Sequence, residues 1–467
     1  MGKHGQRWFS SLLTVLLLWS LGSVSPVAVS SSAPEESGPI TLVMAVDLSY
    51  GGVREQLINK WNQIHPKNPV RLVEQPPTTD LQRAQILAAE QAGERGYDVL
   101  HLDLTWTAEF AENQVIRPLN PKILTAEGAP ADFLKPALDS AYYTAQDEAE
   151  RKLWAVPYTT DAGLLFYRAD LLKESGLTPP GTWDEMRRAA QIVRDKQIST
   201  SPNRQSPIEA AYVTQLDQYE GLTVNTLEMT SGVGEDLRAL PGKSKGIEQL
   251  ANFFGSRADQ VILPESKNGD ETASLEAFLA GKVLFMRNWP YVYNQLTAKL
   301  PPGAVGVTQL PRVDGDHPTS PALGGWNLAV AANTTKPRLA EELIEFLTSP
   351  SSQRCLLERS GLPAARAGAY ARDSAAQCEV DPASDQLDFS EGTGTGQTLY
   401  QNDEALRALE TALRNAQPRP TTPYYPQVTE VIQATVSDVL DQVLRDEDYS
   451  ETLSELPEKL GEAQRGH

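Results

Sequence analysis

The sequence predicts an α/β protein of two or three domains, and two observations carry this prediction. Between residues 40 and 114, segments of strand character alternate with segments of helix character, which is typical of a parallel sheet covered by helices. The chain has 467 residues, and a single hydrophobic core seldom extends over so many. Its hydrophobic content of 40% and aromatic content of 7% indicate an ordinary globular protein.

The alternating segments of this first part can be assigned one by one. Apolar runs predict strands, and apolar residues three or four positions apart predict helices. The expected strands are residues 40–46, 69–75 and 97–103, and the expected helices are 53–64, 81–92 and 106–114. Ligands of such sheets bind beyond the carboxyl ends of the strands. The residues at these ends are Asp47, Ser49, Tyr50, Thr78, Thr79, Asp80, Asp103 and Trp106.

The later segments mix helices and extended runs. Two short extended runs are expected around Pro157, and Thr182 with Glu185 forms a capping-box pattern before a helix at 182–196. Residues 207–228 have a helical appearance. The remaining expectations are helix–strand–helix over 274–296, extended runs at 303–311 and 323–332, helices at 338–347 and 352–361, and a helical tail interrupted at 417–426.

The N-terminus has the pattern of a secretory signal peptide. Lys3 and Arg7 precede an apolar run over residues 9–21, which is shorter than the ~20 residues that span a bilayer. We therefore expect a signal peptide at 1–30 and a linker at 31–38, with an uncleaved anchor as the alternative. No cysteine lies near the cleavage region, so a lipid anchor is not supported and a periplasmic or extracellular protein is expected.

Composition and motifs exclude several functions. The formal net charge of −20 argues against nucleic acid and anionic membranes as partners. The sequence has no phosphate-binding glycine loop, no His-Glu-x-x-His and no Cys-x-x-Cys. Its five histidines are scattered, which makes a serine–histidine arrangement hard to build. We expect no catalytic residue, metal or cofactor.

The two cysteines, Cys355 and Cys378, predict one disulfide. An even pair of cysteines in an exported protein favours a disulfide. The bond would clamp one C-terminal segment, because both residues lie within it. Two free buried thiols are the alternative.

Acidic and aromatic residues at the ends of the expected elements suit a carbohydrate ligand. Carboxylates accept strong hydrogen bonds from sugar hydroxyls, and flat rings cover the apolar faces of a sugar. Taken singly, each ring is better explained by core packing and each acid by a helix cap or a solvated loop. Together the set consists of Asp47, Asp103, Asp161, Glu220, Tyr50, Trp106, Tyr158, Trp289, Tyr291 and Trp326.

Six stretches follow one another along the chain: YDVLHLDLTW, VPYTTDAGLLFYRADLL with TWDEM, YEGLTVNTLE, FLAGKVLFMRNWPY, LGGWNLAV and PRPTTPYYPQV. In this order they resemble family 1 extracellular solute-binding proteins of ABC sugar importers, most of all their trehalose/maltose-binding branch. The likeness covers nearly the whole chain after the linker.

The resemblance implies a two-lobe periplasmic-binding-protein fold of the class II type. It further implies that the sugar binds in the cleft between the lobes, that the lobes close by a hinge motion, and that membrane permeases receive the sugar. A monomer is expected. The first lobe is expected to comprise residues 39–155 and 304–348, and the second lobe residues 156–303 and 349–467.

The resemblance also implies roles for individual residues. Asp103 and Asp161 match the sugar-binding acids of the first and second lobes, and Glu220 matches a third polar contact. Trp289 matches a stacking ring, with Tyr291 beside it. The remaining matches are Gly325 and Trp326 in the Gly-Gly-Trp turn, Arg419 as a late arginine reaching the cleft, Thr79 as a hydroxyl contact, and Tyr50 in the first loop.

The resemblance leaves the ligand open. An α-linked disaccharide such as trehalose, maltose or sucrose is expected first, and a sugar-like compatible solute such as glucosylglycerol is the alternative. A third hypothesis is a secreted glycoside hydrolase with a carboxylate pair drawn from Asp103, Asp161 and Glu220, which would need a defined separation between the two carboxyls.

Overall fold

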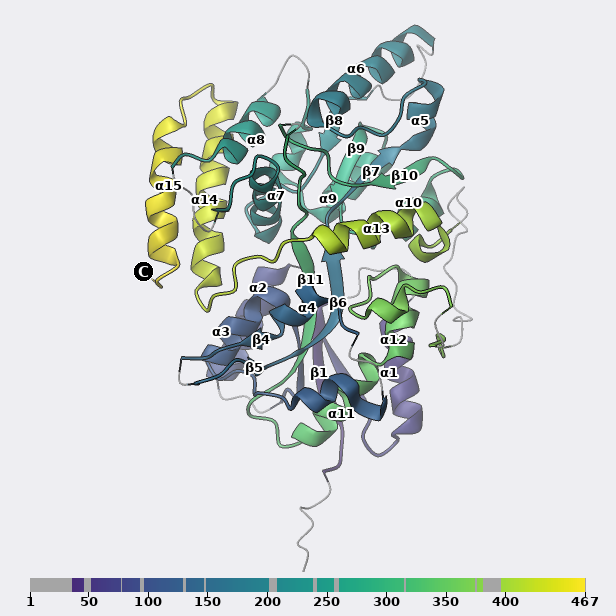
Figure 1. Ribbon diagram of the computed structural model, residues 1–467, viewed down its shortest axis with the longest axis vertical. Coiled ribbons are helices and arrows are strands. Elements are labelled where there is room, and N and C mark those ends of the chain that lie inside the picture. Colours follow the sequence, from purple (N-terminus) through teal and green to yellow (C-terminus); the bar gives the residue numbers. More distant parts are fainter. Residues whose placement is uncertain are drawn as a thin grey trace, which may run out of the picture. The chain divides into compact units, whose positions relative to one another are not determined.

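The fold is described by a computed structural model. It covers residues 36–45, 52–76, 78–92, 96–128, 132–146, 148–200, 208–237, 242–255, 260–314, 316–373, 376–380 and 396–466. The predicted signal peptide at 1–30, most of the linker and Tyr50 lie outside these ranges. In the part that is described, none of the helices combines the length and apolar character that crossing a membrane requires. The chain from residue 37 onward forms two lobes, each built around a β-sheet (Figure 1).

The first lobe contains a five-stranded sheet in the order β2-β1-β3-β11-β6. The three N-terminal strands pair in parallel, as the sequence predicts, and β11 runs antiparallel to both β3 and β6. The central strands are nearly continuous apolar runs because helices cover both faces of the sheet. The strands are β1 (Ile40–Ala45), β2 (Val70–Gln75), β3 (Val99–Asp103), β6 (Val156–Ala162) and β11 (Leu323–Val330).

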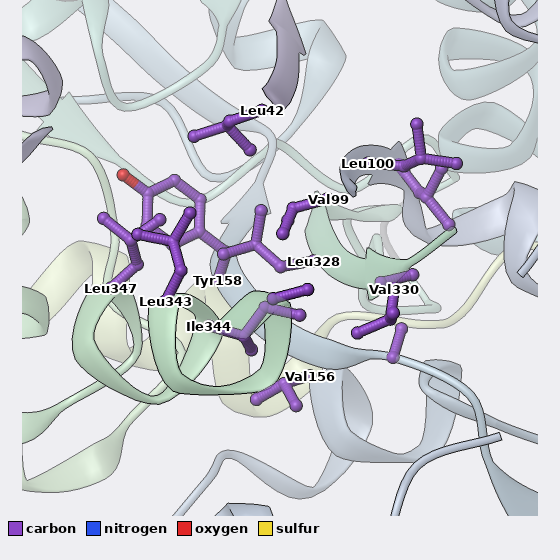
Figure 2. Close-up of a cluster of buried hydrophobic side chains, with 14 of the residues drawn as sticks. Leu42, Val99, Leu100, Val156, Tyr158, Leu328, Val330, Leu343, Ile344 and Leu347 are labelled. Atoms are coloured by element: carbon purple, nitrogen blue, oxygen red, sulfur yellow. The ribbon is translucent and has the colours of Figure 1, made fainter. Parts of the chain in front are cut away.

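The core of the first lobe lies between this sheet and its helices. Figure 2 shows Leu42, Val99 and Leu328 of the sheet near Leu343 and Ile344 of the helix α11. The helices and short strands of the lobe are α1 (Val53–Ile64), α2 (Thr79–Gln91), α3 (Thr107–Glu112), α4 (Lys135–Ser140), α11 (Pro337–Leu347), α12 (Pro350–Cys355), β4 (Tyr142–Tyr143) and β5 (Lys152–Leu153).

The second lobe contains a four-stranded sheet in the order β10-β7-β9-β8. Alternate residues of β7 enter two different cores: Leu165 and Tyr167 pack on one face of the sheet, and Leu164 and Phe166 on the other. The sheet is therefore buried on both sides. Its strands are β7 (Leu164–Arg168), β8 (Ala210–Val213), β9 (Val283–Asn288) and β10 (Val305–Thr308).

Helices cover both faces of the second sheet. The C-terminal helices α14 and α15 pack on the core that includes Leu165, and α13 packs on the core that includes Phe166. The helices of this lobe are α5 (Ala169–Glu174), α6 (Trp183–Thr200), α7 (Glu220–Ser231), α8 (Lys245–Gly255), α9 (Glu271–Leu279), α10 (Val292–Lys299), α13 (Asp403–Asn415), α14 (Tyr425–Leu444) and α15 (Ser450–Ala463).

Two strands belong to a different sheet from the one that the predicted lobe ranges imply. We expected residues 156–162 in the second lobe and 304–308 in the first. In the structure β6 pairs with β11 in the first sheet, and β10 pairs with β7 in the second. The chain crosses between the sheets at Gly163, which joins β6 to β7, and again before Leu323 at the start of β11.

A helix over 207–228 is predicted, but residues 208–228, the part that the structure describes, are not one helix, so this prediction is wrong. They contain the strand β8, a short connection and α7, which begins only at Glu220. All four residues of β8 are buried, and such a short apolar run carries no periodicity that separates a strand from a helix. Glu220 is consequently the first residue of a helix rather than a residue within one.

The predicted capping box before α6 is only half formed. The Glu185 amide donates to Thr182 Oγ1 at 3.2 Å, as expected. The Glu185 carboxylate, however, accepts from the amide of Gly181 at 2.7 Å rather than from that of Thr182. Two other predictions hold: Cys355 and Cys378 form a disulfide, and a helix covers most of 352–361, with α12 continuing as a π-helix over Leu356–Ser360.

Candidate functional site

Strand register gathers polar and aromatic residues at one end of the first sheet. Trp326 of β11 pairs with Asp103 of β3 on one side and with Thr159 of β6 on the other. These three residues therefore form a row across neighbouring strands. Asp161 pairs with Gly324, and it shares a face with Thr159 because side chains two apart on a strand point the same way.

The row borders a cavity of about 260 Å³ whose walls come from both lobes. All the residues to which the resemblance gives a binding role and that the structure describes line it, whereas Trp106 of the wider acidic and aromatic set does not; Asp47 and Tyr50 lie outside the described residues. The lining residues used below are Thr79, His101, Asp103, Thr159, Asp161, Tyr219, Glu220, Glu271, Trp289, Tyr291, Gly324, Gly325, Trp326 and Arg419. The sequence motifs thus predicted residues that meet in space, although they are spread over more than 300 positions.

Arg419 holds two of the predicted acids together. Its Nη2 lies 2.9 and 3.0 Å from the two carboxylate oxygens of Asp103, and its Nη1 lies 2.7 Å from Glu220 Oε1. Asp103 ends a strand of the first sheet and Glu220 begins a helix of the second lobe, so the arginine bridges the lobes. All three side chains are buried.

Neighbouring hydroxyls donate further hydrogen bonds to the ion triad that Asp103, Arg419 and Glu220 form. Thr105 Oγ1 donates to Asp103 Oδ1 at 2.7 Å, Thr429 Oγ1 donates to Glu220 Oε2 at 2.8 Å, and the Tyr425 hydroxyl donates to Glu220 Oε1. Burial raises the pKa of Glu220, and Arg419 opposes that rise. Burial alone would lower the pKa of Arg419, but the Asp103 and Glu220 carboxylates raise it. The triad is therefore well supplied with hydrogen bonds before any ligand binds.

Asp161 has a contrasting environment. Its side chain is buried, and its Oδ1 has no hydrogen-bond partner among the described residues. Burial raises its pKa to about 8, although the charge of Arg287 favours the ionised form. A carboxyl group in this state can donate to a ligand oxygen when protonated or accept from a ligand hydroxyl when ionised.

Two tryptophan rings at the cavity each have one face covered by protein. The Arg287 guanidinium lies 4.0 Å from the centroid of Trp289, and the His101 ring stacks on Trp326 with centroids 4.4 Å apart. Burial lowers the pKa of His101 well below its usual value, so its imidazole is neutral at pH 7. Because both tryptophans also line the cavity, each ring is fixed by its environment before a ligand arrives.

The Gly-Gly pair before Trp326 is required by close packing. Gly325 has φ +128°, and a Cβ at this position would lie 2.4 Å from the carbonyl oxygen of Thr159. A Cβ at Gly324 would lie 2.9 Å from the Trp289 ring and 3.0 Å from Asp161 Cβ. Any larger residue would therefore push the neighbouring strand, the ring or the acid away from the cavity.

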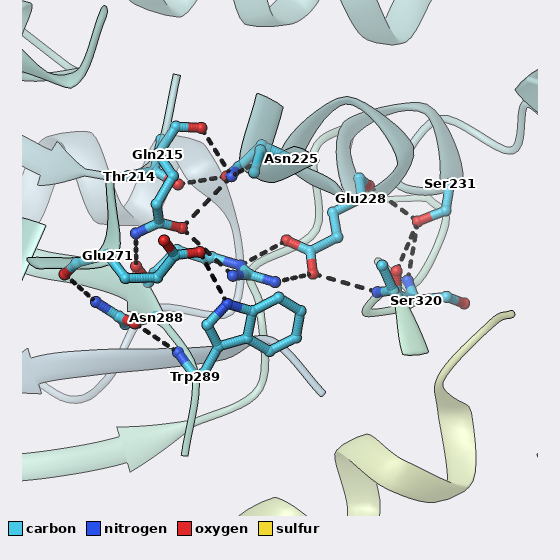
Figure 3. Close-up of polar contacts among 12 residues, drawn as sticks. Thr214, Gln215, Asn225, Glu228, Ser231, Glu271, Asn288, Trp289 and Ser320 are labelled. Atoms are coloured by element: carbon cyan, nitrogen blue, oxygen red, sulfur yellow. Dashed lines mark hydrogen bonds and ion pairs between the residues drawn. The ribbon is translucent and has the colours of Figure 1, made fainter. Parts of the chain in front are cut away.

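Sequence reasoning missed Tyr219 and Glu271. The Tyr219 hydroxyl donates to Glu271 Oε2 at 2.7 Å. Trp289 Nε1 donates to the other carboxylate oxygen, Glu271 Oε1, at 3.1 Å (Figure 3). Glu271 is the first residue of a helix, a position where acids are common for helix-dipole reasons, so nothing in the sequence marked it. No group of three or more potential metal ligands occurs among the described residues.

Comparisons with known proteins identify a family and a relative that match most of the chain. A model of the family described as bacterial extracellular solute-binding protein matches residues 48–354. A probable ABC transporter-binding protein of Deinococcus radiodurans is 30% identical over 440 residues, which are 90% of this chain and 93% of the relative.

Two solved structures have the same fold. Maltose-bound MalE3 of T. maritima is 25% identical with a TM-score of 0.72, and the match covers 91% of this chain and 99% of that protein. The GacH receptor of Streptomyces glaucescens, studied unliganded and with acarbose, is 20% identical with a TM-score of 0.70, and the match covers 93% and 100% of the two chains.

Proposed function

The chain belongs to family 1 of the bacterial extracellular solute-binding proteins, and we propose that it captures a sugar for an ABC importer. We propose an α-linked disaccharide, such as trehalose, maltose or sucrose, as the ligand, with a sugar-like compatible solute such as glucosylglycerol as the alternative. The cavity described above would be its binding site. The loaded protein would then deliver the sugar to the permease subunits of the importer.

Unpaired polar atoms around the cavity carry this proposal. Asp161 Oδ1, Thr159 Oγ1, His101 Nδ1 and Arg419 Nε are buried and have no hydrogen-bond partner among the described residues. All four residues line the cavity. A buried polar group without a partner costs about 1–3 kcal/mol. These atoms have almost no accessible surface, so a ligand with several hydroxyls would supply partners to those side chains that turn toward it, and would remove that cost.

The tryptophan rings favour a sugar over a fully polar solute. Trp289 and Trp326 line the same cavity as the unpaired polar atoms. A pyranose ring has hydroxyls around its rim and C–H groups on its faces, so it requires both kinds of surface. The maltose bound to the relative from T. maritima supports the choice of an α-linked disaccharide and of the trehalose/maltose-binding branch.

The state of the carboxylates favours binding over hydrolysis. Asp103 and Glu220 are both held by Arg419, whereas a glycosidase needs one carboxyl free to give a proton and another free to attack or activate water. Family and fold are also those of substrate-binding proteins. We propose that residues 1–30 direct export and that the protein acts in the periplasm or outside the cell.

Titration calorimetry with the chain from residue 31 onward tests the proposal. The panel consists of trehalose, maltose, sucrose, glucosylglycerol and mannitol at pH 7. One α-linked disaccharide is expected to bind with a micromolar or lower Kd, about −8 kcal/mol or more favourable. The proposal is wrong if none of them binds below millimolar concentration. Release of sugar from a chromogenic glucoside should be absent.

A further inference from the structure

Arg287, which lies against the Trp289 ring, is a buried cation that does not itself line the cavity. It is the fifth residue of β9 and has an exposed fraction of 1%. Its Nε and Nη2 donate to the two carboxylate oxygens of Glu228 at 2.9 and 2.7 Å, and its Nη1 donates to Gln215 Oε1 at 3.3 Å. The pair with Glu228 is thus bidentate, and both charges are removed from solvent.

The guanidinium of Arg287 also supports the ring of Trp289. It lies 4.0 Å from the ring centroid, a distance at which a cation and an indole attract each other. The edge of the ring is fixed separately, because Nε1 donates to Glu271 Oε1 (Figure 3). Trp289 is therefore held on one face and at one edge, and it lines the cavity.

The same ion pair packs against both segments that cross between the sheets. A Cβ at Gly163, which joins β6 to β7, would lie 2.4 Å from Glu228 Oε1 and 2.6 Å from Arg287 Nη2. Glu228 Oε1 also accepts from the amide of Ala322 at 3.2 Å, one residue before β11 begins. Figure 3 shows Glu228 between this segment and Trp289. The pair thus links a ring of the cavity to the two segments that run directly from one sheet to the other, while a third connection between the lobes lies between α12 and α13.

We propose that the Arg287–Glu228 pair is a positioning device for sugar binding. It holds the Trp289 ring in the orientation that a sugar face requires, and it ties that orientation to the crossings about which the lobes would move. The inference rests on the proposed function. Arg287 does not line the cavity and acts mainly through Trp289, while its charge also acts on Asp161, so most of its effect on affinity should disappear when the ring is absent.

A double-mutant cycle tests this dependence with maltose and trehalose as probes. The pair is replaced as a unit, Arg287→Met with Glu228→Gln, because removing the arginine alone would leave a buried carboxylate unpaired. The glutamine retains an acceptor for the Ala322 amide. This replacement is expected to weaken sugar binding about tenfold in the wild-type background and less than twofold in a Trp289→Ala background.

Arg366 offers a matched control. It is buried, pairs with Asp132 at 2.9 Å and lies 4.0 Å from the ring centroid of Phe133, but none of these residues lines the cavity. Replacing it in the same way, Arg366→Met with Asp132→Asn, should leave sugar affinity unchanged. An equal loss here would mean that any buried pair affects binding through the fold, and would overturn the proposal.

The other outcomes separate this inference from the proposed function. If the Arg287 replacement weakens binding equally with and without Trp289, the pair does not act through the ring and the positioning role is wrong while the sugar receptor stands. The positioning role is also wrong if Trp289→Ala leaves affinity unchanged. Failure of the wild-type chain to bind either sugar, or any other member of the panel, overturns both proposals.

Discussion

The cavity has two acidic regions that differ in how their charges are satisfied. Asp103 and Glu220 share Arg419 and receive further hydrogen bonds from threonine and tyrosine hydroxyls. Asp161 is influenced by the charge of Arg287, and its Oδ1 has no partner among the described residues. In the first region both carboxylates are paired without a ligand, and only Arg419 Nε lacks a partner among the described residues, whereas in the second region the acid itself is unpaired.

This difference indicates that the two regions contribute to different properties of the protein. A group whose hydrogen bonds are already made gains little from a ligand, whereas an unpaired buried group gains a bond and loses a desolvation penalty. We therefore expect the ion triad of Asp103, Arg419 and Glu220 to contribute mainly to the contact between the lobes. Asp161 and its neighbour Thr159 are expected to contribute mainly to ligand binding.

The largest effect is expected from Arg419→Met. Without the guanidinium, the buried carboxylates of Asp103 and Glu220 would lose their cation, and breaking a buried ion pair in this way costs about 3–5 kcal/mol. Urea denaturation of the ligand-free protein at pH 7 should show a loss of this size. Arg338→Met, which removes an exposed pair with Glu342, should cost less than about 1 kcal/mol. Equal losses would mean that the triad is no more important than a surface pair.

A smaller effect on stability is expected from Asp161→Asn, which at pH 7 should raise the free energy of unfolding rather than lower it. The pKa of Asp161 is raised from 3.8 to about 8, so between these values the folded state holds a proton that the unfolded state has released. The free energy of unfolding of the wild-type protein should therefore fall as pH rises, by up to about 1.4 kcal/mol per pH unit from this group. Asn does not titrate, so the variant should lack this fall.

Denaturation at pH 5 and pH 7 measures this contribution. Relative to the wild-type protein, the ligand-free Asn variant should gain up to about 3 kcal/mol between the two pH values. The exposed Asp438→Asn should change nothing. Asp161→Ala should weaken sugar binding up to about tenfold at pH 7, where the carboxyl is mostly protonated, since a hydrogen bond between neutral groups contributes about 0.5–1.5 kcal/mol. A variant that is less stable at pH 7 than the wild type would make Asp161 a structural residue.

The sequence predicted those parts of the fold that depend on local patterns. The strands around Leu42, Leu72 and Leu100 and their parallel pairing follow from apolar runs that alternate with helical periods. The strand at Ala210–Val213 was missed because four residues carry too little periodicity. The sheets to which β6 and β10 belong depend on pairing with strands more than 100 positions away, which no local pattern records.

For the candidate site too, the sequence predicted which residues take part, but not how they interact with one another. Motif resemblance identified Asp103, Glu220 and Arg419, but the ion triad that they form joins positions up to 316 residues apart. A sequence motif states which residue types meet at a site, not which of them pair with one another. Glu271 was missed for the opposite reason, since an acid at a helix start is too common to attract notice.

The smallest effects on stability and affinity are expected from replacing one threonine in each region. Thr105→Val removes a hydroxyl that donates to Asp103 at 2.7 Å and should lower the free energy of unfolding by about 1–2 kcal/mol. Thr159→Val removes a buried hydroxyl without a partner among the described residues, so the ligand-free protein should be as stable as the wild type or slightly more stable. The order of the two variants should be reversed for sugar affinity. Thr159→Val should weaken binding about fivefold, which corresponds to about 1 kcal/mol, and Thr105→Val should weaken it less. If both variants lose the same stability, the Thr159 hydroxyl is already satisfied and the two regions do not differ as proposed.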